Sequence, residues 1–101
     1  MTPIEALAQI GLTPEESRVY IAALEVGSSP ASTIARKCDL KRETCYYTLK
    51  KLLGRGLMST VIKNNITYYT AEEPEKLISQ AESRLDLARK IAPELTDLMN
   101  T

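Results

Sequence analysis

Two helix-start signatures open the chain, and each leads into apolar residues at helical spacing. Thr2–Glu5 and Thr13–Glu16 both read Thr-Pro-x-Glu, in which Thr caps the helix and Pro takes its first position. Gly11 stops the first segment two residues after Gln9, and Gly27 follows the second. The pattern predicts a short helix and then a longer one that runs to about residue 26.

A break at Ser28-Ser29-Pro30 separates these helices from two further ones. Ser32 is placed to cap a helix of about two turns. The apolar residues on one face of that helix are Ile34, Ala35 and Cys38. Another helix begins at Arg42 and ends near Gly54, with an apolar stripe made of Cys45, Leu49 and Leu52. The sequence therefore predicts two short helices joined by a tight turn.

The apolar period changes after Gly56. Residues 58–63 and 66–70 are rich in β-branched and aromatic side chains and flank the turn pair Asn64-Asn65, which predicts a β-hairpin. A last helix opens at Pro74, and Pro93 within it removes one backbone donor and is expected to kink it. Its heptad-like apolar stripe comprises Ile78, Ala81, Leu85, Ala88, Ala92, Leu95 and Met99. So small a domain cannot cover this stripe, so we expect it to hold a homodimer together.

Length and composition bound the class of protein. The 101 residues fit one domain, which we place at residues 1–73, followed by a dimerisation helix at residues 74–101. With 44% hydrophobic and 26% charged residues, the chain has the composition of a soluble globular protein. The longest apolar run is far too short to span a membrane, and the first twelve residues lack the basic start of a secretory signal. We therefore expect a cytoplasmic protein with no membrane partner.

The charge is unevenly distributed although the net charge is zero. Residues 36–63 hold eight basic residues and two acidic ones, a net of +6, whereas the segments before and after each carry −3. A concentrated basic segment is typical of nucleic-acid binding. The simpler alternative is that any exposed helix face is charged.

The residue inventory argues against catalysis. The sequence has no His and only two Cys, so no Ser-His, Cys-His or usual zinc site can form. We expect no enzyme activity, no metal and no cofactor. Cys38 and Cys45 are most simply reduced core residues. A thiol redox switch remains an alternative, because the two cysteines flank the turn between the short helices.

The order helix, helix, turn, helix, hairpin is that of a winged helix-turn-helix, a mainly α fold with a small β-hairpin wing (α+β). The second short helix would enter the major groove of double-stranded DNA, and the hairpin would contact its backbone. The expected DNA-binding residues lie on the polar sides of these elements: Ser32, Lys41, Arg42, Glu43, Thr44, Tyr47, Lys50, Lys51, Lys63, Asn64, Asn65 and Thr67.

The side-chain chemistry of this set suits DNA. Lys50 and Lys51 can contact phosphate or guanine, and Arg42 can form a bidentate pair. Glu43 can accept a hydrogen bond from cytosine N4, and Tyr47 offers both a ring and a hydroxyl. At the border of the apolar stripe, Tyr46 can equally pack against the hairpin or contact DNA, whereas Tyr69 is expected in the core.

An ordered set of segments resembles the TrmB family of winged-helix regulators and covers nearly the whole chain. The segments are Gly11–Leu24, Ser32–Lys37, Arg42–Tyr46, Gly56-Leu57, and Tyr69–Ala71 leading to Pro74-Glu75. The resemblance implies a prokaryotic transcriptional regulator, often archaeal, that binds operator DNA through its recognition helix and wing and pairs through its long helix.

The chain also departs from the family pattern. Lys41 stands where the family often has Pro, and Cys45 stands where it often has a β-branched residue. We expect a short form without the C-terminal domain that binds sugars in larger members, so a sugar effector is not carried over. A winged helix that docks on a protein without touching DNA remains the alternative from another functional class.

Overall fold

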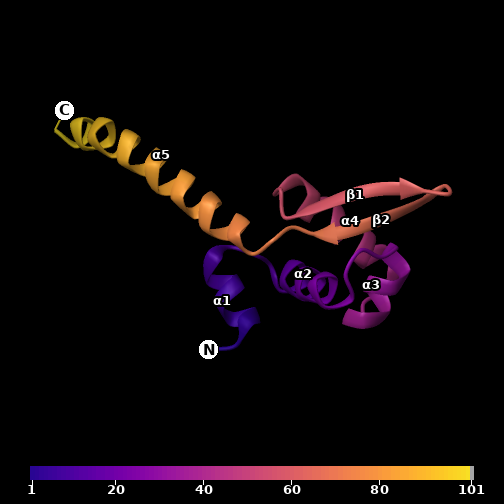
Figure 1. Cartoon of the computed structure of the whole chain (residues 1–101). Helices are drawn as coiled ribbons and strands as arrows, with labels where there is room; N and C mark the ends of the chain where they lie inside the picture. Colours follow the sequence, from indigo (N-terminus) through magenta and orange to yellow (C-terminus); the bar gives the residue numbers. More distant parts are fainter. Residues whose placement is uncertain (101) are drawn as a thin grey trace.

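The computed structural model describes residues 1–100, which form five helices and one β-hairpin (Figure 1). The elements in chain order are α1 (Pro3–Ile10), α2 (Pro14–Val26), α3 (Ala31–Cys38), α4 (Arg42–Gly54), β1 (Met58–Lys63), β2 (Ile66–Ala71) and α5 (Glu75–Met99). The predicted winged helix-turn-helix with a long C-terminal helix is confirmed. No helix in this part of the chain combines the length and the apolar character that crossing a membrane requires.

The first two helices begin where their capping signatures predict. At α2, Thr13 Oγ1 accepts from the Glu16 N–H at 3.1 Å, and Glu16 Oε1 accepts from the Thr13 N–H at 2.8 Å, which completes the capping box. At α1, Thr2 Oγ1 accepts from the Glu5 N–H at 3.2 Å. Gly11 ends α1 with a φ of 113°, a left-handed conformation that a side chain would strain.

The start of α3 differs from the prediction. Pro30, not Ser32, occupies the cap position, and Ser32 lies within the first turn of the helix. The cause is a tertiary contact: Ser29 forms a two-bond bridge with Tyr69, with N···O distances of 3.1 and 2.8 Å. A helix capped by Ser32 would begin at Thr33, whereas α3 begins at Ala31, two residues earlier and directly after the segment that this bridge holds.

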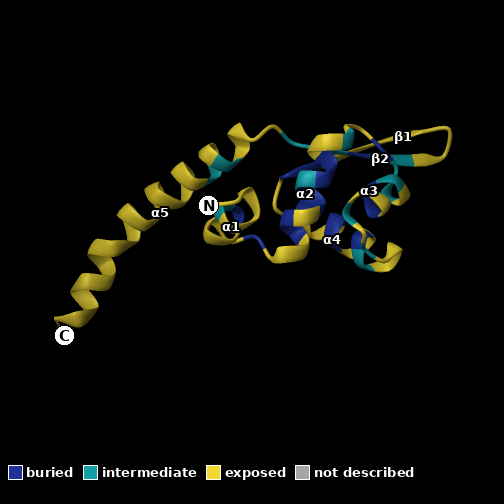
Figure 2. Cartoon of the chain, turned by 90° about the horizontal axis from the view of Figure 1, so that it is seen from below, coloured by how far each residue is buried: buried dark blue, intermediate teal, exposed yellow. Residues whose placement is uncertain are grey.

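The core lies where α2, α3 and α4 meet the inner face of the hairpin (Figure 2). Its fully buried side chains include Val19 and Tyr20 of α2, Ile34 of α3, and Leu49 and Leu52 of α4. The Tyr20 hydroxyl donates to the Glu72 carbonyl at 2.9 Å, so a core residue also holds the segment that leaves the hairpin.

The hairpin pairs β1 and β2 antiparallel, from Met58 opposite Ala71 to Lys63 opposite Ile66. Asn64 and Asn65 form the turn with φ values of 51° and 63°, the left-handed conformation that asparagine tolerates and two-residue hairpin turns require. The strands therefore project beyond the helices as a wing, as Figure 1 shows.

The long helix α5 leaves the domain on the side opposite the wing tip (Figure 1). Near its start, Leu77 packs against the core and Gln80 Nε2 donates to the Arg55 carbonyl at 2.7 Å. From residue 81 to residue 99, every residue is exposed, and the helix continues through Pro93 as a single element. Its 25 residues extend for about 37 Å at 1.5 Å per residue.

A partly buried ion pair joins the start of α2 to the end of α4. Arg55 Nε donates to Glu16 Oε2 at 2.7 Å, and Arg55 Nη2 donates to the Gly11 carbonyl at 3.1 Å. Burial alone would raise the pKa of Glu16, but the hydrogen bonds from Arg55 and Thr13, together with the Arg55 charge, outweigh it and lower the pKa below 4.5. The ionised carboxylate therefore stabilises the fold.

We predict that Arg55→Met destabilises the chain at pH 7, because it leaves the buried Glu16 carboxylate without its cation. The expected loss is roughly 2–3 kcal/mol, below the range of about 3–5 kcal/mol for breaking a fully buried pair. The discount reflects the 39% exposure of the Arg55 side chain, which lets water screen the pair. Urea unfolding followed by circular dichroism measures the difference.

The pH dependence has a definite sign. Because the pKa of Glu16 is lower in the folded state, its contribution is complete above pH 4.5 and is lost as the pH falls through the lowered value. The gap between Arg55→Met and the unchanged chain should therefore narrow below pH 4.5. Glu15→Gln, at an exposed site one residue earlier, is the control and should change stability by less than about 0.5 kcal/mol. Equal stability of the Arg55→Met and unchanged chains at pH 7 would contradict the assigned role.

Candidate nucleic-acid interface

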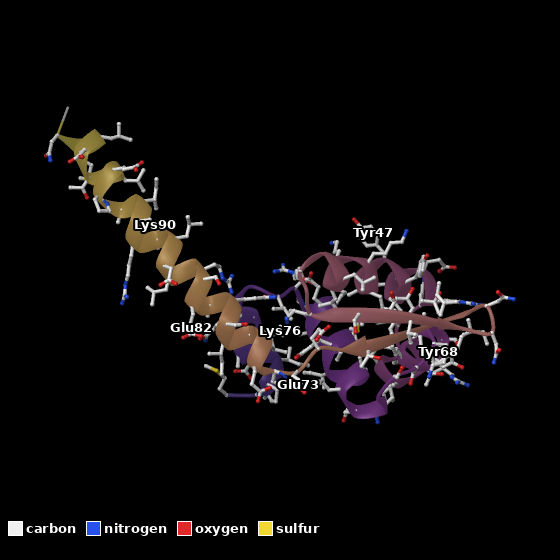
Figure 3. All side chains as sticks on the ribbon, turned by 45° about the horizontal axis from the view of Figure 1, so that its top comes forward. Tyr47, Tyr68, Glu73, Lys76, Glu82 and Lys90 are labelled. Atoms are coloured by element: carbon white, nitrogen blue, oxygen red, sulfur yellow. The ribbon has the colours of Figure 1, made fainter. Side chains whose placement is uncertain are left out.

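The two sides of α4 differ sharply in burial. Cys45, Leu49 and Leu52 are fully buried on the inner side. On the opposite side, Tyr47 and Lys50 are exposed, and Tyr47 points away from the rest of the domain (Figure 3). The apolar stripe thus fixes which residues α4 presents to solvent.

A groove of about 600 Å³ lies between the start of α3, the first two turns of α4 and the wing. Ten residues line it: Pro30, Ala31, Ser32, Arg42, Glu43, Tyr46, Asn65, Ile66, Thr67 and Tyr69. Five of the twelve expected DNA-binding residues are among them, although they come from three segments of the chain. The fold therefore brings Ser32, Arg42, Glu43, Asn65 and Thr67 to one surface.

The other seven expected residues lie outside this groove. Lys41 and Thr44 belong to the start of α4, whereas Tyr47, Lys50 and Lys51 follow its outer side. All of these are exposed except the partly buried Thr44. The remaining two, Lys63 and Asn64, are exposed at the wing tip.

Two tyrosines that were not among the expected DNA-binding residues also line the groove. Tyr46 is 46% exposed and lines the groove between α4 and the wing. Tyr69 is a core residue, as predicted, yet part of it also reaches the groove, and burial raises its pKa. Tyr46 follows Glu43 by three positions, a spacing that puts both on one side of a helix and could have identified it.

The first turns of α3 and α4 both border the groove, and neither has a side-chain cap. Pro30 and Lys41 occupy the cap positions and supply no side-chain oxygen to the first-turn N–H groups. Helix N-termini of this kind carry partial positive charge and suit an anionic oxygen. The groove thus combines two such ends with the Arg42 side chain.

One basic residue of the central segment does not contribute to this surface charge. Arg55 is paired with Glu16, which lies outside the segment, so its charge is neutralised within the fold. The other seven basic residues are exposed: Arg36, Lys37, Lys41, Arg42, Lys50, Lys51 and Lys63. The positive surface is therefore smaller than the sequence count indicates but is carried by α3, α4 and the wing.

Residues 7–75, more than half of the chain, match the family model described as the sugar-specific transcriptional regulator TrmB. The chain belongs to the TrmB family. It is thus a member of a family of DNA-binding winged-helix transcriptional regulators, which are typically not enzymes. No curated protein sequence matches this TrmB-family chain significantly.

Solved structures share its fold. TrmBL2, an archaeal chromatin protein whose structure is described as showing a novel mode of DNA binding, is similar with a TM-score of 0.72 and 24% identity over 96% of this chain. A probable transcriptional regulator from Pseudomonas aeruginosa is similar with a TM-score of 0.60 and 19% identity, and the match covers 89% of this chain and 77% of that one. A MarR family regulator from Silicibacter pomeroyi is similar with a TM-score of 0.61 and 18% identity, and the match covers 92% of this chain and 57% of that one. This chain spans 42% of the archaeal protein's length.

The two cysteines of this TrmB-family chain interact with each other, Cys38 from the end of α3 and Cys45 from within α4. Cys45 is fully buried and its Sγ lies 3.7 Å from the Ala31 carbonyl, whereas Cys38 is partly buried. Burial, with a smaller contribution from the Cys38 thiol, raises the pKa of Cys45 to about 11. A buried thiol of this kind is poorly reactive, which favours the core interpretation of Cys45 over the redox switch.

We predict that Cys45 resists alkylation by iodoacetamide in the folded chain. At pH 8, only about one Cys45 thiol in a thousand would be ionised, given a pKa of about 11. Mass spectrometry of Cys38→Ser, in which Cys45 is the only thiol, should show little labelling until denaturant is added. Cys45→Ser is the matched variant and should label faster, because Cys38 is partly exposed. Equal labelling rates in the folded variants would restore the redox alternative.

Proposed function

We propose that the chain regulates transcription by binding double-stranded operator DNA as a homodimer, with one α4 in the major groove of each half-site. The observation that carries this proposal is the outer side of α4, which is exposed, basic and aromatic while its inner side is fully buried. A helix anchored in this way can enter a groove without unfolding any part of the core. Family membership and the shared fold support the same conclusion.

Base contacts are assigned to the start of α4. Arg42 and Glu43 lie in the first turn, where recognition helices usually meet base edges, and both line the groove that faces the wing. The uncapped first turns of α3 and α4, which border the same groove, are suited to phosphate oxygens next to the contacted bases.

Backbone contacts are assigned to the wing. Lys63, Asn64 and Asn65 stand at its tip, and all are exposed. A lysine and two amide side chains offer donors to phosphate and sugar oxygens but carry little sequence information by themselves. Wing and helix should therefore affect binding differently when they are altered.

We predict that Arg42→Ala changes base preference, whereas Lys63→Glu weakens binding to all duplexes to a similar extent. Losing a base contact should cost roughly 1–3 kcal/mol on the preferred duplex and much less on a scrambled one. Losing a phosphate contact should also reduce the slope of affinity against salt by about one counterion. Selection from random duplex DNA supplies the preferred sequence, and fluorescence anisotropy at several salt concentrations supplies the slopes.

The selection itself tests the proposed symmetry. Enriched sequences should contain two inverted half-sites whose centres lie about one helical turn, or a multiple of it, apart. Lys90→Glu, at an exposed position far along α5, is the control and should leave base preference unchanged. If no duplex is retained in a salt-dependent way, the protein-docking alternative replaces DNA binding.

Dimerisation through α5 is proposed from its uncovered apolar stripe. Ile78, Leu85 and Leu95 are all exposed. An apolar groove between the end of α1 and the start of α5 continues this stripe, since Ile10 and Leu77 line it together with Ile78 and Leu85. A second copy that covered both surfaces would remove a contiguous apolar patch from water.

We predict that Leu85→Asp combined with Leu95→Asp yields a folded monomer. The two carboxylates would be placed in the apolar stripe that the second copy covers, where burial without a cation is unfavourable. Sedimentation velocity at micromolar concentration should show dimers for the unchanged chain and monomers for the variant, with equal helicity by circular dichroism.

Lys90→Asp places a carboxylate on the polar side of the same helix and should remain dimeric, because position 90 lies opposite the stripe at about 100° per residue. If the unchanged chain is monomeric, or if Lys90→Asp is monomeric as well as the double variant, the apolar stripe of α5 is not the dimer interface.

A further inference from the structure

Two tyrosines on the outer side of α4 each hold a lysine one helical turn further along. Lys50 Nζ lies 5.0 Å from the centroid of the Tyr46 ring, and Lys51 Nζ lies 4.8 Å from that of Tyr47. Both distances fall within the range of about 6 Å in which a ring face attracts a cation. The two pairs run side by side along the exposed helix surface, because Tyr46 and Tyr47 are consecutive and so are their lysines.

The pairs fix where the two positive charges stand. Helical side chains lean towards the N-terminus, and each ring holds its lysine in that direction, so the ammonium groups lie over the second turn of α4 instead of the third. A recognition helix meets base edges with its N-terminal half. The tyrosines therefore bring the charge of Lys50 and Lys51 closer to the part of α4 that would contact DNA.

A ring orients a lysine without neutralising it. Within residues 1–100, neither Lys50 nor Lys51 forms an ion pair, in contrast to Arg55, whose charge is matched by Glu16. If a carboxylate held the lysine instead of a ring, a DNA phosphate would have to displace that carboxylate, and the two negative groups would repel each other. A tyrosine leaves the full charge available and restricts the flexible lysine side chain before binding, which lowers the entropy cost of the contact.

We propose that Tyr46 and Tyr47 are positioning residues, each of which acts on DNA through the lysine that its ring holds. This inference rests on the proposed function of α4. The pair of Tyr47 and Lys51 provides the cleaner test, because Tyr47 is 62% exposed and lies outside the groove, whereas Tyr46 lines the groove and can also touch DNA itself.

The test is a double-mutant cycle of Tyr47→Leu and Lys51→Met, measured by anisotropy on the selected duplex, or on a mixed-sequence duplex of about 30 base pairs if none is enriched. Tyr47→Leu should weaken binding about two- to fivefold, which is within the entropy cost of immobilising one flexible side chain at an interface. In the Lys51→Met background it should have no further effect. Tyr47→Phe keeps the ring and should bind like the unchanged chain. Leucine is a good helix former, so α4 should persist in the variant.

A second readout examines the pair in the free protein. The Lys51 side-chain protons next to Nζ should show an upfield ring-current shift by NMR in the unchanged chain and in Tyr47→Phe, but not in Tyr47→Leu. The cycle of Tyr47→Leu with Lys63→Met is the matched control and should be additive, because Lys63 stands at the wing tip whereas the Tyr47 ring holds Lys51 on α4.

The outcomes separate this inference from the proposed function. If the unchanged chain binds duplexes but Tyr47→Leu costs the same with and without Lys51, the ring contacts DNA directly and the inference is wrong. Weak binding by Tyr47→Phe would assign the effect to the hydroxyl and also overturn it. Absence of salt-dependent binding by the unchanged chain would overturn the proposed function, and this inference with it.

Discussion

The ion pair between Glu16 and Arg55 is the interaction on which the arrangement of the helices depends. Glu16 caps α2 with one carboxylate oxygen and accepts from Arg55 with the other, so a single side chain closes a helix start and holds the end of α4. Arg55 also donates to the carbonyl of Gly11, and its own carbonyl accepts from Gln80 of α5. Four helices thus meet at one residue pair. Since α4 and α5 are both attached there, the direction in which α5 leaves the domain is tied to the position of α4.

Local signals in the sequence predicted most of the fold. The two Thr-Pro-x-Glu signatures, the turn pair Asn64-Asn65 and the apolar stripe of α4 each act within a few residues, so their meaning does not depend on the rest of the chain. The prediction was wrong at Ser32, because the bridge between Ser29 and Tyr69 joins residues forty positions apart and overrides a local cap preference. Long-range contacts of this kind leave no periodic trace in a single sequence.

The candidate site was predictable as a set of residue types but not as a geometry. Helical spacing separated the inner and outer sides of α4, which placed Tyr47 and Lys50 correctly on the exposed side. The sequence count treated all basic residues of the central segment alike, whereas the fold uses Arg55 as an internal partner. It also could not show that Tyr69 of β2 lines the same groove as Arg42 and Tyr46 of α4, since that depends on where the wing folds back. Which charges are neutralised is a property of tertiary structure.

The same distinction explains how a chain of zero net charge can present a positive surface. Among the acidic residues of the flanking segments, Glu16 is paired with Arg55, and those of α5 lie on the helix that leads away from the wing. Histidine, the side chain that ordinarily changes charge between pH 5 and 8, is absent from the sequence. The chain thus lacks the usual means of altering this charge pattern near neutral pH. Because a surface of exposed, unpaired cations acts by releasing counterions, ionic strength is the solution variable that most directly governs the proposed binding.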